Sequence, residues 1–145
     1  MDEISLDDLV PMSVWRIAQM PAGGEKSVVI LREEHGEGLL PIAIGLCEAA
    51  ALEKLLEAKA TGRLSVRPFT HELLTTVIER LDGNVERGIV TRLEHETFFA
   101  CLVIRRGDEE WRVDARPSDV VSAVLASGAS LYASRGLIEQ VSGEA

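Results

Sequence analysis

The fold is read most directly from the segment Trp111-Arg-Val-Asp-Ala-Arg-Pro-Ser-Asp-Val-Val-Ser-Ala-Val-Leu-Ala-Ser-Gly128. Its first residues alternate between apolar and charged, which is the two-residue period of a half-buried strand. At Arg116-Pro117 the pattern becomes helical, because the fixed φ of proline suits a first helical turn, where its missing N–H is not needed. Gly128 is a natural helix end. The segment therefore predicts a strand, a tight corner and a helix.

Four polar side chains are expected to crowd into this corner: Asp114, Arg116, Ser118 and Asp119. Asp114 and Asp119 could together hold a divalent cation, since hard cations take oxygen ligands and need only one or two carboxylates. Such cations assist phosphodiester hydrolysis. Alternatively, Arg116 neutralises one carboxylate and Asp119 complements the helix dipole. The residue types alone favour this second, structural interpretation.

A second polar group lies at another Arg-Pro corner, Arg67-Pro68, which precedes a predicted helix. His71 can take part in proton transfer near neutral pH, although it could equally cap or pack at the helix start, where Glu72 favours the dipole. Arg67 and Arg116 each carry the planar guanidinium that suits phosphate binding. Glu48 follows Gly45 at the start of an earlier helix and admits the same two readings, ligand or dipole partner.

The composition fits one domain expected in the cytoplasm. The chain has 145 residues, of which 46% are hydrophobic, and a net charge of −9 without any run of Lys or Arg. This charge counts against a nonspecific electrostatic grip on nucleic acid, while leaving room for a local basic groove. We expect no signal peptide and no membrane segment. Cys47 and Cys101 lie far apart and are expected to be reduced, buried thiols.

The remaining pattern predicts a three-stranded meander, a helix, a second helix, a further run of strands and a final amphipathic segment. The strands are expected at 14–20, 27–31, 39–44, 85–93, 97–105, 110–114 and 130–133, with helices at 47–58 and 70–81. Strand 39–44 is mostly apolar, which favours a central place, but Pro41 requires its start or an edge. In helix 70–81 the residues expected to form a buried stripe are Leu73, Leu74, Val77, Ile78 and Leu81.

These elements indicate a single α+β domain, a mixed or antiparallel sheet with helices packed on it. We assign residues 1–12 to an acidic lead-in, 13–141 to the domain and 142–145 to a tail. No Walker loop, dinucleotide fingerprint, H-E-x-x-H or C-x-x-C pattern occurs, so we expect no organic cofactor.

Three blocks occur in the order and spacing of a known family. They are Leu40-Pro-Ile-Ala-Ile-Gly-Leu-Cys-Glu-Ala-Ala-Ala-Leu52, Arg67-Pro-Phe-Thr-His-Glu-Leu-Leu74 and Val113-Asp-Ala-Arg-Pro-Ser-Asp-Val-Val-Ser-Ala-Val-Leu125. Together they resemble the bifunctional nuclease domain across residues 14–138. The resemblance implies a wedge-shaped α+β homodimer with a groove at its thick end, and nuclease activity on RNA and DNA. The chain departs from the family at Glu72, where Asp is common, and at Ala43, where Trp is common.

The resulting hypothesis is a metal-assisted nuclease that acts on RNA or DNA in a surface groove. Asp114, Asp119 and Glu48 would bind Mg²⁺ or Mn²⁺, and His71 with Glu72 would complete the catalytic set. Arg67, Arg116 and Ser118 would contact the substrate. The alternative is a non-catalytic dimeric binding or regulatory module, in which the same polar residues only fix the strand-to-helix corners.

Overall fold

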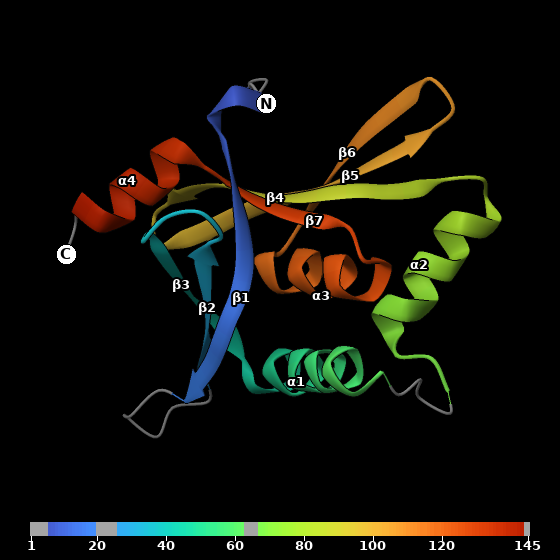
Figure 1. Ribbon diagram of the computed structural model, residues 1–145, viewed down its shortest axis with the longest axis horizontal. Helices are drawn as coiled ribbons and strands as arrows, with labels where there is room; N and C mark the ends of the chain where they lie inside the picture. The colour runs from blue at the N-terminus through green and yellow to red at the C-terminus, as the bar shows by residue number, and fades with distance from the viewer. Residues whose placement is uncertain (1–5, 20–25, 63–66, 144–145) are drawn as a thin grey trace.

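The computed structural model describes residues 6–19, 26–62 and 67–143 and confirms an α+β domain (Figure 1). The strands are β1 (Leu9–Gln19), β2 (Lys26–Glu33), β3 (Leu39–Gly45), β4 (Asn84–Glu94), β5 (Thr97–Arg106), β6 (Glu109–Ala115) and β7 (Ser130–Ser134). The helices are α1 (Leu46–Thr61), α2 (Thr70–Arg80), α3 (Pro117–Ser127) and α4 (Arg135–Gly143), with a short 3₁₀ turn at Leu6–Asp8.

All seven strands form one mixed sheet in the order β3-β2-β1-β7-β4-β5-β6. Only β4 and β7 pair in parallel, and the other neighbours are antiparallel. The predicted meander is confirmed at one edge of the sheet, and the hairpins of β4, β5 and β6 form the other. Helix α3 carries the chain from the edge strand β6 back to the central strand β7 (Figure 1).

Two strands differ from the sequence prediction. The first begins at Leu9, inside the expected lead-in, and Pro11 lies in β1 opposite Tyr132 of β7. The Pro11 carbonyl accepts a bond from the Glu34 backbone N–H, so its oxygen is used although the residue has no N–H to donate. Strand β3 lies at the sheet edge, which is the place that Pro41 required, so the alternative central place is wrong. The sequence also predicts a turn at 22–25, between the first two strands, and this segment falls outside the described residues.

Helix α3 packs closely on the sheet, and a glycine makes this approach possible. Val120, Val121 and Val124 of α3 are buried in the main core. A Cβ on Gly88 of β4 would clash with the Val120 side chain and lie 2.8 Å from Val124 Cγ2. Glycine at this position therefore lets the helix sit directly on the strand. Helices α1 and α2 both pack against α3, so α3 is the element that positions the other two.

The expected buried stripe of α2 is wrong. Leu73, Leu74, Val77 and Leu81 are all exposed, and Ile78 is half-buried. Thr75 is the buried residue of this helix. The helix turns a different face toward α3 and β4, because periodicity shows that an apolar stripe exists without showing what covers it. The stripe is an exposed apolar surface in one copy of the chain.

The two cysteines differ in burial. Cys101 is buried, and this burial raises the pKa of its thiol, whereas Cys47 is exposed in the first turn of α1, contrary to prediction.

None of the helices in the described ranges has the length and apolarity needed to cross a membrane.

Candidate active site

The first turns of three helices meet at one polar network. Arg116 is the N-cap residue of α3, Glu48 lies in the first turn of α1, and His71 lies in the first turn of α2. The Arg116 guanidinium donates to Glu48 Oε1 at 3.1 Å and to both carboxylate oxygens of Asp119, at 2.8 and 3.1 Å. His71 Nε2 lies 3.2 Å from Asp119 Oδ1. One chain of contacts thus links residues that are far apart in the sequence.

Arg116 does not use all of its N–H groups in this network. A guanidinium has five N–H groups, and three of them serve Glu48 and Asp119. One N–H on each of Nη1 and Nη2 therefore has no acceptor within the described ranges. The two carboxylates raise the pKa of Arg116 further above its ordinary value, so it stays charged. Its side chain is 63% exposed, which leaves the free N–H groups accessible from solvent.

Asp119 orients His71 as well as Arg116. The hydrogen bond from Arg116 lowers the pKa of Asp119 below its ordinary value; partial burial opposes this shift, and the contact with His71 reinforces it. The carboxylate is therefore ionised at neutral pH and can only accept hydrogen bonds. The proton shared with His71 must then sit on Nε2, because Oδ1 has none to donate. Neutral His71 consequently carries its lone pair on Nδ1.

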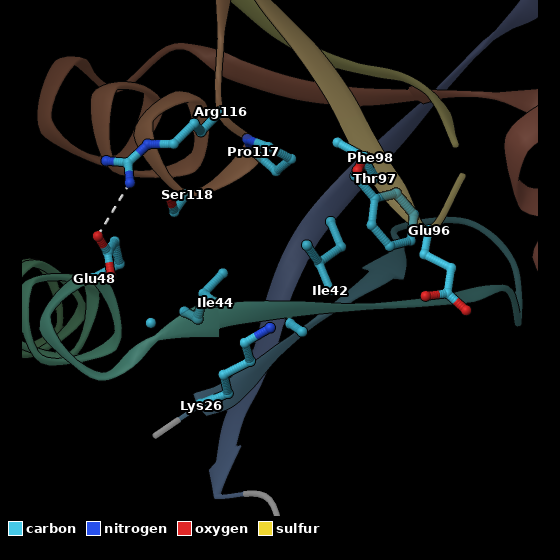
Figure 2. Close-up of a pocket in the computed structure, with 12 residues that line it drawn as sticks. Lys26, Ile42, Ile44, Glu48, Glu96, Thr97, Phe98, Arg116, Pro117 and Ser118 are labelled. Carbon is cyan, nitrogen blue, oxygen red and sulfur yellow. Dashed lines mark hydrogen bonds and ion pairs between the residues drawn. The ribbon is translucent and has the colours of Figure 1, made fainter. Parts of the chain in front are cut away.

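Two cavities open on either side of the Glu48–Arg116 pair, and both residues line both cavities. The sheet cavity, of about 480 Å³, lies between β3, the start of β5 and the start of α3. The helix cavity, of about 570 Å³, lies between α1 and the start of α2. Figure 2 shows Glu48 and Arg116 closing one end of the sheet cavity. Each volume is within the range of known ligand sites, roughly 300–1,000 Å³.

The other residues predicted for the site have different positions. Ser118 is buried and lines the sheet cavity. Glu72 accepts a hydrogen bond from the Phe69 backbone N–H at 2.8 Å, which ties down the start of α2. Arg67 is exposed and lies one residue before the segment that lines the helix cavity. Of these three residues, Ser118 lines a cavity, Glu72 makes a contact at the start of α2, and Arg67 lines neither cavity.

Asp114 stands apart from this network. It pairs with Cys101 in the β5–β6 ladder, on the sheet face opposite the one that α3 covers. It lines neither cavity, and no hydrogen bond within the described ranges joins it to Asp119. Nor do these ranges contain a group of three or more His, Cys, Asp or Glu side chains placed to hold a metal ion. Glu48 and Asp119 both accept hydrogen bonds from the Arg116 guanidinium.

Sequence reasoning missed four residues that line the cavities. Phe98 and Lys26 lie in the sheet cavity, and Phe69 and Lys54 lie in the helix cavity. Phe98 shares its cavity with Ala43, the position noted above as lacking Trp. A strand pattern assigns Phe98 to a sheet face without showing that the face opens into a cavity. Of the four, only Phe69 lies next to a sequence feature that could have indicated its role, the Arg67-Pro68 corner.

Comparison with known proteins identifies the family. The model of the bifunctional nuclease domain matches residues 29–145. Two proteins of Mycobacterium tuberculosis described as uncharacterized, from strains CDC 1551 / Oshkosh and ATCC 25618 / H37Rv, are each 36% identical over 78% of this chain. The chain spans 65% of their length. A protein of Arabidopsis thaliana named Bifunctional nuclease 2 is 29% identical over 73% of this chain and 32% of its own length. With this match over most of its length, the chain belongs to the bifunctional nuclease domain family.

Proposed function

We propose that this chain hydrolyses phosphodiester bonds of RNA or DNA in the groove around Arg116. The observation that carries this proposal is the Glu48–Arg116–Asp119–His71 network, which places an anion-binding group beside a proton acceptor in a member of a nuclease family. The name of the Arabidopsis relative supports the same reaction class.

Arg116 and two helix starts would hold the phosphate. The free N–H groups on Nη1 and Nη2 match two phosphate oxygens, so binding requires no break in the contacts to Glu48 and Asp119. Gly45, the N-cap residue of α1, has no side chain to cap its helix, and the Arg116 side chain does not cap α3; both residues line the sheet cavity. Backbone N–H groups at helix starts attract anions. The groove can therefore stabilise charge that builds up on phosphorus-bound oxygens.

His71 would serve as the general base. Its Nδ1 lone pair can take a proton from a water molecule as the water oxygen attacks phosphorus, while Nε2–H stays bonded to Asp119. The imidazolium formed is stabilised by the Asp119 carboxylate and can release its proton to solvent, while the leaving oxygen takes a proton from solvent. Because Arg116 and His71 share the Oδ1 atom of Asp119, the phosphate-binding group and the base are held in one fixed relation.

A divalent cation remains part of the proposal. Magnesium is often held by only one or two carboxylates together with substrate phosphate, and Glu48 and Asp119, which flank the Arg116 guanidinium, would supply them. When bound, the cation would offset phosphate charge. Asp114 lies on the other face of the sheet and would not share a cation with that pair.

The test is cleavage of labelled single-stranded RNA and DNA with Mg²⁺, Mn²⁺ or EDTA. His71→Gln should lower the cleavage rate by about 100-fold or more, the usual contribution of a general base. His95→Gln is the matched control, because His95 lies exposed in the turn between β4 and β5. Absence of cleavage by the wild type, or equal rates for the wild type and His71→Gln, would refute the proposed activity.

A second candidate is a non-catalytic dimeric binding module, and the exposed apolar stripe of α2 favours it. In that case the network around Arg116 only ties three helix starts together. The two candidates differ in stability. His71→Ala should lower the melting temperature by several degrees if the bond to Asp119 is structural, whereas loss of an active-site residue leaves stability unchanged or raised.

A further inference from the structure

The two cavities are each lined by one phenylalanine and one lysine, and this similarity bears on the substrate of the proposed nuclease. The sheet cavity contains Phe98 and Lys26, and the helix cavity contains Phe69 and Lys54. Arg116 lines both. Each side of the phosphate-binding residue thus offers one aromatic ring and one ammonium group. Figure 2 shows Phe98, Lys26 and Arg116 on different sides of the sheet cavity.

This arrangement suits two neighbouring nucleotides whose bases are not stacked on each other. A base has a flat face that packs well on an aromatic ring, but inside a duplex both faces are covered by adjacent base pairs. A ring within a cavity can therefore be reached only by a base that has left the stack. We propose that the groove binds single-stranded nucleic acid, with the phosphate at Arg116 and the flanking bases on Phe69 and Phe98.

The charge of the molecule supports a single strand over a duplex. Duplex binding rests on many phosphate contacts spread over a basic surface, and this chain carries a net charge of −9. The two cavities are lined by three cationic side chains, Lys26, Lys54 and Arg116, together with the carboxylates of Glu48 and Glu96. Three neutralised phosphates on a single strand predict a slope of roughly −2 when the logarithm of affinity is plotted against that of salt concentration.

The experiment measures binding in EDTA, independently of cleavage. A short fluorescein-labelled DNA strand is compared with the same strand annealed to its complement, and the same strand carrying 2-aminopurine reports stacking by loss of fluorescence. We expect the single strand to bind about tenfold or more tightly than the duplex, with quenching of the 2-aminopurine. Phe69→Leu and Phe98→Leu, which keep an apolar side chain, should each weaken binding by about 5- to 100-fold.

Phe99→Leu is the matched control. Phe99 is the next residue on β5, half-buried on the opposite face under the Arg92 guanidinium, and lines neither cavity. Equal affinity for strand and duplex, no binding of the strand, or equal effects of Leu at 69, 98 and 99 would overturn the inference. Selective strand binding without any cleavage would support it and refute the proposed nuclease activity. Cleavage of strand and duplex at the same rate would support the nuclease activity and refute the preference for a single strand.

Discussion

At the residue scale, the planar guanidinium of Arg116 can be tested separately from its positive charge. Arg116→Lys keeps the positive charge but loses the planar fork that reaches two carboxylates and a phosphate together. We expect cleavage of single-stranded RNA to fall by about 100- to 1,000-fold. The melting temperature should change little, because the lysine ammonium can still pair with the Asp119 carboxylate at this exposed position.

The control for this prediction is Arg105→Lys. Arg105 of β5 also joins two carboxylates, donating to Glu86 at 3.1 Å and to Glu110 at 3.2 Å, but it lies outside both cavities. Its replacement should leave the cleavage rate unchanged. Equal losses in the two variants would mean that surface charge, and not the position of Arg116, governs the reaction.

Asp119 gives a pH-dependent prediction at the same scale. Its hydrogen bond to Arg116 lowers the pKa of the carboxyl below the ordinary 3.8. A group whose pKa is depressed in the folded state stabilises that state above its ordinary pKa, and the contribution is lost as the pH falls through the folded value. Asp119→Asn should therefore be less stable than the wild type at pH 7, and this difference should shrink below a pH of about 4.

Urea unfolding between pH 7 and pH 3 measures this difference directly. Asp114→Asn serves as the control, since Asp114 is exposed on the other sheet face and makes no contact with Arg116 within the described ranges. A stability difference for Asp119→Asn that is constant across this pH range would show that the ion pair with Arg116 does not stabilise the fold.

At the element scale, the seating of α3 on β4 should control both stability and activity. In Gly88→Ala the new Cβ meets Val120 and Val124, which pushes α3 from the sheet. Overpacking of this kind costs about 1–3 kcal/mol, a fall in melting temperature of roughly 3–10 °C. Because α3 carries Arg116 and Asp119, the cleavage rate should fall as well.

Gly136→Ala in α4 provides the comparison, measured by the same thermal unfolding. A Cβ at Gly136 meets no atom within 4 Å, and alanine is a better helix former by up to about 1 kcal/mol. This variant should be as stable as the wild type or more so. If Gly88→Ala were equally well tolerated, the close contact of α3 with β4 would not be needed for the fold.

The elements themselves could be read from local sequence. Pro117 and Gly128 bound α3 within a residue of the prediction, because a proline at a helix start and a left-handed glycine after its end act through nearby backbone alone. The burial of α2 could not be read in the same way. Its apolar stripe is real, but whether the core or another surface covers it depends on residues far away in the sequence.

The sequence predicts most of the residues that form the site but not how they are placed relative to one another. The sequence points to Glu48, His71, Arg116 and Asp119, and in the structure they form one network. Asp114 was grouped with Asp119 because the two are close in sequence. The strand that precedes the corner alternates sides, so Ala115 faces α3 and Asp114 faces away. Proximity in the sequence does not reveal that Asp114 and Asp119 lie apart. It also does not show that Phe98 lines a cavity.

At the scale of the whole molecule, the open apolar surfaces suggest a second copy as their partner. Leu73, Leu74, Val77 and Leu81 line the outer side of α2, and the edge strand β6 exposes Trp111 and Val113. Clusters of exposed apolar side chains mark interaction surfaces. An antiparallel pairing of two β6 strands centred on Val113 would also set Arg112 opposite Asp114 of the second copy, which is a self-complementary arrangement.

We therefore expect a homodimer, with a mass in light scattering about twice the 15.8 kDa of one chain. Leu73→Glu combined with Val77→Glu should release monomers, since both side chains are already exposed in one copy and their replacement leaves the core intact. Leu39→Glu is the control, because Leu39 is 39% exposed on β3 at the far edge of the sheet. A monomeric wild type, or equal dissociation caused by Leu39→Glu, would exclude this interface. If the monomeric variant still cleaves single-stranded RNA, the groove of one chain suffices for the reaction, as expected from a network built entirely within one copy.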